Sequence, residues 1–188
     1  MTKGRLEAFG DAVIAIIITI MVLELHPPQG TGFDSLLPLA PKFLAYLMSF
    51  VFLAIYWNNH HHLFHAVHHV SGAVLWANLH LLFWLSLVPF TTAWLGQAGA
   101  SSYPVAAYGL VLIAAAVAYF ILVRVLIRVH GADSPIARAI GRDVKGKVSI
   151  GIYALGLLLS PLLPAVSLIL YVLVAGLWLV PDRRFERR

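Results

Sequence analysis

Between Val105 and Val123 the chain carries no charged or strongly polar side chain. A helix needs about 20 mostly apolar residues to cross the hydrocarbon core of a bilayer, so a run of this length indicates a membrane-spanning helix. The composition agrees, since 61% of the residues are hydrophobic, 11% are charged and the mean hydropathy is +0.87. We therefore predict an all-α integral membrane protein. The absence of cysteine excludes disulfides, thiolate nucleophiles and cysteine metal ligands.

The apolar runs divide the chain into six predicted transmembrane helices within a single domain, residues 1–188. Their approximate bounds are 5–25, 39–69, 74–94, 103–130, 146–160 and 165–180. The last two could form one long kinked helix, but Pro161 and Pro164 favour a reversal because proline breaks the helical hydrogen-bond ladder. Ahead of the fifth span, Asp133 or Ser134 before Pro135 is a candidate N-cap for a helix that leads into it.

The basic residues indicate how these spans are oriented. Lys3 and Arg5 lie at the start of the first span, and further lysines and arginines fill the 124–147 connection and the tail at 183–188. With six spans, all of these segments lie on one side, and membrane proteins keep such loops in the cytoplasm. We therefore predict a multi-pass protein of the cell membrane with both termini cytoplasmic. Because orientation accounts for the net charge of +5, nucleic acid is not an expected partner.

The first apolar run, residues 5–25, contains ionisable groups that a simple anchor would lack. Such groups are costly inside a span and usually face a partner or a water-filled path. Ile16, Ile20 and Leu23 recur at i, i+4 and i+7 and share one helix face, with Thr19 beside them. We interpret this face as the lining of a pore, although the same residues could contact lipid or neighbouring helices. Since the sequence has no evident internal repeat, a pore requires copies of the chain around a symmetry axis.

A histidine-rich segment, YWNNHHHLFHAVHH, closes the second predicted span. His61, His65 and either His68 or His69 lie at helical spacing and are candidate ligands of a transition metal. We favour the alternative that they are hydrated side chains at the membrane surface, because no cysteine or acidic cluster completes a tetrahedral site. We therefore predict no resident metal and no other cofactor. Histidine titrates near neutrality, so the segment could also respond to pH.

Polar residues in the first three spans indicate a buried network at one level of the membrane. Arg5 and Asp11 belong to the first span, His60 to the second and Asn78 to the third. Buried polar groups need hydrogen-bond partners, so we expect these side chains to join three helices. Arg5 and Asp11 are about 240° apart around a helix and must find partners on different neighbours. Phe9, four residues after Arg5, shares its face.

The segment RLEAFGD at 5–11 resembles the R-x-x-x-F-S-D signature that opens the first helix in the transmembrane protein 175 family of lysosomal and bacterial potassium channels. Gly10 replaces the usual serine and removes a hydroxyl from the signature. The resemblance covers the first three spans, and the rest agrees mainly in helix count. Further features that agree in spacing are AYLMSF at 45–50, Trp57-x-x-His60, Leu63-Phe64, and Asn78 followed by Pro89.

This resemblance implies a homotetramer of six-helix subunits, with the first helix of each subunit lining a central pore that has no pore loop. Carried over residue by residue, the hydrophobic constriction falls on Ile16, with Ile20 and Leu23 as further layers. Thr19 matches a threonine linked to selectivity. The structural network that positions the pore helix corresponds to Arg5, Phe9, Asp11, Trp57, His60 and Asn78.

We therefore predict a potassium-permeable, weakly selective cation channel whose partners are its own copies, the bilayer and monovalent cations such as K⁺. The chain lacks a T-x-G-Y-G carbonyl filter, so the expected constriction is an apolar ring in which a cation loses part of its hydration shell. Glu24 could concentrate cations at the mouth or pair with His26 or Lys42. The alternative function is a proton- or metal-coupled transporter that uses Asp11 and the histidines. No enzyme is predicted, because the sequence offers no nucleophile, base and oxyanion arrangement.

Overall fold

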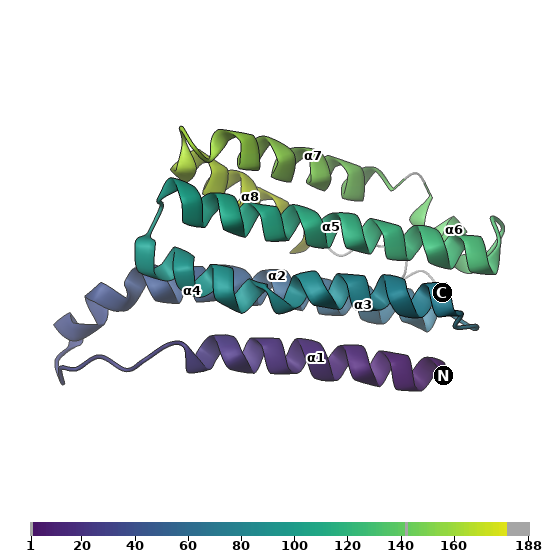
Figure 1. Ribbon diagram of the computed structural model, residues 1–188, viewed down its shortest axis with the longest axis horizontal. Coiled ribbons are helices and arrows are strands. Elements are labelled where there is room, and N and C mark those ends of the chain that lie inside the picture. The colour runs from purple at the N-terminus through teal and green to yellow at the C-terminus, as the bar shows by residue number, and fades with distance from the viewer. Residues whose placement is uncertain (1, 142, 180–188) are drawn as a thin grey trace.

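The computed structural model describes residues 2–141 and 143–179, which form an all-helical bundle (Figure 1). Its layers run from α1 at one edge, through α2 with α3 and α4, to α5 and then to α7 and α8 at the opposite edge. The elements are α1 (Lys3–Leu23), the 3-10 helix η1 (Phe33–Leu39), α2 (Ala40–His65), α3 (Gly72–Ser86), α4 (Val88–Ala98), α5 (Ser102–His130), α6 (Pro135–Ile140), α7 (Val144–Leu159) and α8 (Pro164–Leu179).

Within the described residues, four helical stretches are long and apolar enough to cross a membrane. They are Lys3–Leu23, Phe33–His65, Gly72–Ala98 and Ser102–His130. The regions predicted as the fifth and sixth spans form α7 and α8, with 16 residues each. At 1.5 Å per residue such helices are about 24 Å long, shorter than the bilayer core of about 30 Å.

The reversal predicted near Pro161 and Pro164 is present. α7 ends at Leu159, a turn follows, and α8 begins at Pro164 and packs against α7. α8 therefore runs back toward the end of the bundle at which α1 begins (Figure 1). This end also contains the last turn of α5 and the first turn of α7, and it carries Lys3, Arg128 and Lys147. We call it the basic end; the arginine tail at 183–188 lies outside the described residues.

Two of the predicted spans have different bounds from the helices. The second was expected to remain helical to residue 69, but α2 ends at His65 and residues 67–71 are not helical. The backbone amides of His68 and His69 instead donate to Nε2 of His130 at the end of α5, each at 3.2 Å. The third predicted span is divided into α3 and α4 around Leu87, two residues before Pro89. Proline has no amide hydrogen and its ring crowds the preceding turn, so the break falls there.

The connection before α7 also contains a break. Ser134 is the N-cap of α6, since its hydroxyl accepts from the amide of Ala137 at 3.2 Å. This helix ends at Ile140 rather than leading directly into the fifth predicted span. α7 has its own N-cap, Asp143, whose carboxylate accepts from the amide of Gly146 at 3.2 Å. Side-chain caps of this kind satisfy amides that have no partner inside the helix.

Two buried clusters hold the layers together. The larger joins α1, α2, α3 and α5 through aliphatic side chains such as Leu53, Leu81 and Leu122, all fully buried. The smaller joins α2, α5, α7 and α8 around three tyrosines, including Tyr171. Gly109 and Gly156 face that tyrosine so closely that any added Cβ atom would overlap its ring. The absence of side chains at these two positions sets the spacing of α5, α7 and α8.

Candidate functional site

Helix α1 has one buried and one exposed side. Its buried residues pack on α2, α3 and α4 and recur every three or four positions. They are Leu6, Gly10, Ile14, Ile17 and Met21. The opposite side carries large apolar residues that remain accessible in a single chain, among them Ile16, which is 58% exposed, and Leu23, which is 72% exposed. Helix α1 therefore packs on its neighbours through one apolar face, and a second apolar face remains exposed.

The exposed side, which we call the outer face of α1, consists of Phe9, Ile16, Ile20 and Leu23. At 100° per residue these four positions lie within an arc of about 60°. None of the other described helices covers this face, because α1 forms the edge of the bundle (Figure 1). A continuous apolar strip of this kind is typical of a contact with lipid or with another protein surface. All three residues predicted to line the pore belong to it.

Thr19 lies beside the outer face and is exposed. Its hydroxyl donates to the backbone oxygen of Ala15 at 2.9 Å, within the same helix. A hydroxyl has one donor and two acceptor lone pairs, so this bond uses the proton and leaves the oxygen able to accept. Thr19 therefore presents a partial negative charge at the margin of an otherwise apolar strip.

The residues predicted to form one polar network form two separate pairs. The indole nitrogen of Trp57 donates to Oδ1 of Asp11 at 3.0 Å, which joins α2 to α1. Nε2 of His60 and Oδ1 of Asn78 are 2.7 Å apart, which joins α2 to α3, and both residues are fully buried. Arg5 is exposed and has neither a hydrogen bond nor an ion pair to any other described residue. Phe9, also predicted to belong to the network, lies on the exposed side of α1. Of the two pairs, only Trp57–Asp11 joins α1 directly to a neighbouring helix.

Gly10, at the position where the resemblance leads one to expect serine, faces the ring of His60. A Cβ atom at this position would lie 3.1 Å from Cε1 of the imidazole, tighter than ordinary van der Waals contact. The imidazole also lies against the ring of Phe64, with the centroids 4.4 Å apart. Glycine thus allows the backbone of α1 to approach a buried histidine that is itself held by Asn78.

The histidine-rich segment forms a cluster that differs from the one expected. Nε2 of His61 and Nε2 of His65 are 3.0 Å apart, one helical turn from each other. Glu7 of α1 joins them, with Oε1 at 3.4 Å from Nδ1 of His61. His69 is not part of this group, because the chain leaves the helix after His65. Sequence spacing could not identify Glu7, since only the packing of α1 on α2 brings it there.

Sequence reasoning also missed a buried group of hydroxyls. Ser49 of α2 lies 2.7 Å from Oγ1 of Thr92 on α4 and 2.9 Å from the hydroxyl of Tyr108 on α5. All three residues are buried. The only sequence signal was a polar residue within each of three apolar runs.

At the far end of α1, Glu24 is exposed, and His26 contacts its backbone oxygen rather than its carboxylate.

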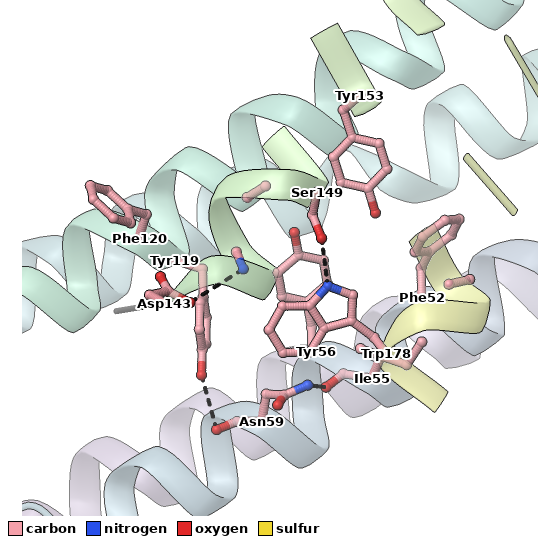
Figure 2. Close-up of a pocket in the computed structure, with 13 residues that line it drawn as sticks. Phe52, Ile55, Tyr56, Asn59, Tyr119, Phe120, Asp143, Ser149, Tyr153 and Trp178 are labelled. Carbon is pink, nitrogen blue, oxygen red and sulfur yellow. Dashed lines mark hydrogen bonds between the residues drawn. The ribbon is translucent and has the colours of Figure 1, made fainter. Parts of the chain in front are cut away.

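A cavity of about 50 Å³ lies between α2, α5, α7 and α8, and Figure 2 shows the residues that line it. The indole nitrogen of Trp178 donates to the hydroxyl of Ser149 at 2.8 Å, and the hydroxyl of Tyr119 donates to the backbone oxygen of Asn59 at 3.2 Å. The rest of the lining is largely aromatic and aliphatic. This cavity lies on the side of α2 that faces away from α1, so it is separate from the outer face.

Comparison with known proteins identifies one family. The family described as endosomal/lysosomal potassium channel TMEM175 matches residues 5–89. A potassium channel of Chryseobacterium sp. (strain P1-3) is 54% identical over 187 residues, which cover 100% of this chain and 97% of that protein. The endosomal/lysosomal proton channel TMEM175 of Gallus gallus is 27% identical over 139 residues, and the match covers 71% of this chain but only 27% of that protein.

The fold agrees with the same family. The crystal structure of a lysosomal potassium-selective channel TMEM175 homologue from Chamaesiphon minutus matches with a TM-score of 0.81 and 30% sequence identity. The match covers 96% of this chain and 97% of that one. Sequence identity and fold similarity thus extend over nearly the whole chain, beyond the RLEAFGD segment that carried the resemblance. The chain belongs to the TMEM175 family.

Proposed function

We propose that this protein is a potassium-permeable, weakly selective cation channel of the cell membrane. The observation that carries the proposal is the outer face of α1, an apolar strip with the Thr19 hydroxyl at its margin, which no other described helix covers. The names of the relatives support it, because the Chryseobacterium protein is a potassium channel and the Chamaesiphon homologue a potassium-selective one.

In this proposal four copies surround one axis, and each contributes its α1 to a central pore. The position of α1 at the edge of the bundle permits such an assembly, because closed cyclic symmetry brings the same edge of every subunit to the axis (Figure 1). Ile16, Ile20 and Leu23 then form successive apolar rings. The helices at the opposite edge, α7 and α8, face the lipid.

The apolar rings select cations by the cost of dehydration. A narrow apolar ring offers no ligands to replace lost water, and K⁺ holds its hydration shell less tightly than Na⁺ does. The free-energy cost of dehydration is therefore larger for Na⁺ than for K⁺. The selectivity for K⁺ stays modest because few ligands replace the lost water. The Thr19 oxygen supplies one such ligand per subunit next to the rings, since its proton is held by Ala15. Apolar rings of this kind can also close a pore by excluding water.

The orientation follows from the positive-inside tendency. We place the basic end in the cytoplasm, together with both termini, and assign α7 and α8 as the fifth and sixth spans. Their length of about 24 Å is compatible with spans that traverse a locally thinned bilayer. Helix α8 is described only to Leu179, where the described residues end.

The Trp57–Asp11 and His60–Asn78 pairs have a positioning role in this channel. They tie α1 to α2 and α2 to α3, on the side of α1 away from its exposed strip. In the transporter alternative, Asp11 would instead carry a proton or bind a coupled metal ion. The two readings differ in Asp11→Asn, which abolishes coupled flux in a transporter but leaves passive K⁺ current in a channel.

The experiment that tests the proposal is recording of single-channel currents from purified protein in planar bilayers, with K⁺ and Na⁺ on opposite sides. Ile16→Ala and Ile16→Asn should raise the conductance and lower the K⁺ preference, because each widens or wets the ring. Ile169 is a matched control, since it is an isoleucine of α8 with an exposure of 59% against 58% for Ile16. Ile169→Ala should leave the current unchanged. Unchanged currents in both Ile16 variants would refute the assignment of the constriction.

A further inference from the structure

Glu7, His61 and His65 bring three metal-ligating side chains together at the basic end. One ligand atom from each lies within 4.8 Å of the others. Glu7 comes from α1, whereas the two histidines come from consecutive turns of α2. Two histidines at i and i+4 on one helix face are a recurrent metal-binding arrangement, because one turn of helix places both rings over the same point.

The separation of the two imidazoles suits a metal ion. Their Nε2 atoms are 3.0 Å apart. Bonds of 2.0–2.1 Å to a tetrahedral Zn²⁺ place two nitrogen ligands about 3.3 Å apart, so a small rotation of either ring is sufficient. The rings are inclined at 81° to one another, which allows each nitrogen to point toward a shared position beside them. A metal ion would take the place of the present contact between these two nitrogens.

The carboxylate of Glu7 contributes in two ways, first by orienting His61 and then as the ligand from α1. Oε1 lies 3.4 Å from Nδ1 of His61, where it favours the tautomer whose Nε2 lone pair is free for a metal. In the proposed site, a movement of its flexible side chain makes the same carboxylate the third ligand. Lys3, four residues before Glu7 on α1, donates to the backbone oxygen of His65 at 3.2 Å. The negative charge therefore remains directed at the imidazoles.

The cluster is open to solvent and is tied to the rest of α1. The side chains of His61 and Glu7 are 36% and 20% exposed, which leaves room for a water molecule as a fourth ligand. His61 stacks on Trp57, with ring centroids 5.7 Å apart and an interplanar angle of 17°. Trp57 in turn donates to Asp11. An ion at this point would fasten α1 to α2 beside an existing contact.

We propose that Glu7, His61 and His65 form a site for a divalent first-row transition metal ion, for which Zn²⁺ is the test ion, and that the ion cross-links α1 to α2. Imidazole and carboxylate together suit Zn²⁺, Ni²⁺ and Cu²⁺ better than Mg²⁺ or Ca²⁺, which prefer oxygen-only sites. The inference does not depend on conduction, since it concerns binding by the folded chain. It therefore stands or falls separately from the proposed channel function.

The test is calorimetric titration of Zn²⁺ into the full-length protein, purified in detergent without a polyhistidine tag and freed of metal with a chelator. The wild type should bind one Zn²⁺ per subunit. His61→Ala and His65→Ala should remove this binding, and Glu7→Gln should weaken it by about 10- to 100-fold, the usual effect of losing a supporting carboxylate. Mg²⁺ should give no saturable binding.

The matched control is the double variant His68→Ala, His69→Ala, which removes two exposed histidines just beyond α2 whose only hydrogen bonds to His130 come from their backbone amides. It should bind Zn²⁺ like the wild type. Unaltered binding in His65→Ala, or an equal loss in the control, would overturn the proposal. Circular dichroism and gel-filtration profiles identify any variant that fails to fold. For such a variant, His65→Gln provides the replacement, because it keeps a polar side chain at an exposed position.

Discussion

The buried pair of His60 and Asn78 gives a prediction whose magnitude follows from the structure. Both residues are fully buried, and Nε2 of His60 and Oδ1 of Asn78 are joined across 2.7 Å. Replacing one partner leaves the other buried without its hydrogen bond, which costs about 1–3 kcal/mol in protein interiors. Double-mutant cycles on hydrogen bonds between the helices of one membrane protein gave coupling energies that average about 0.6 kcal/mol and reach about 1.7 kcal/mol. We therefore expect His60→Leu and Asn78→Val each to lower the free energy of unfolding by about 1–2 kcal/mol.

The double variant should behave differently from the sum of the two. Among the described residues, Nδ1 of His60 and Nδ2 of Asn78 have no hydrogen-bond partner, so the native pair already carries an unsatisfied donor or acceptor on each side. Replacing both residues by apolar ones of similar size removes every one of these polar atoms, and such exchanges are often nearly neutral. The double variant should therefore unfold within about 0.5 kcal/mol of the wild type, although the single costs add to about 2–4 kcal/mol.

The assay is reversible unfolding by sodium dodecyl sulfate in mixed micelles, followed by circular dichroism, for the wild type and the three variants. The double-mutant cycle yields the coupling energy between the two positions. Additive losses would refute the reasoning, because they would mean that each residue stabilises the fold through packing and not through the other. If both single variants unfold with the wild-type free energy, the reasoning is also refuted. That result would show that the His60–Asn78 hydrogen bond does not contribute to stability.

Two further predictions concern packing and selectivity. Gly109→Ala should destabilise the protein by about 1–3 kcal/mol in the same assay, because its Cβ atom would overlap Tyr171, whereas Gly151→Ala in α7 meets no atom within 4 Å and should be neutral or slightly stabilising. Thr19→Val keeps the shape of the side chain but removes its oxygen, so the ratio of K⁺ to Na⁺ permeability measured from reversal potentials should fall toward one, while Thr19→Ser should retain it. A Thr19→Val channel with the wild-type ratio would exclude the hydroxyl as a selectivity determinant.

The sequence alone predicted the class of the protein and much of its helical layout. Long apolar runs identified α1, α2 and α5 because length and hydropathy are local properties that a bilayer constrains directly. Pro161 and Pro164 located the reversal between α7 and α8, since proline disrupts the interior of a helix but is tolerated in its first turn, where Pro164 lies. The signature at 5–11 also pointed to the correct family, because it combines specific residue types at fixed spacing.

What the sequence could not determine was which side chains meet across helices. Helical periodicity placed Ile16 and Ile20 on one face, but only the packing of the opposite face on α2, α3 and α4 shows that the other described helices leave this face uncovered. Glu7 lies more than fifty positions before His61, so no local pattern could associate them. The end of α2 at His65 likewise depends on His130, which accepts from backbone amides of the segment that follows.

Local sequence thus determined where the chain is helical and which residue types each helix offers, because apolar length and backbone propensity act within one segment. Tertiary structure decided that the expected polar network would be two separate pairs, that Glu7 would replace His69 beside the histidines, and that one face of α1 would stay open. These outcomes depend on the rotation and spacing of neighbouring helices. Contacts such as Gly10 against His60 and Gly109 against Tyr171 set that geometry, and their partners are distant in the chain.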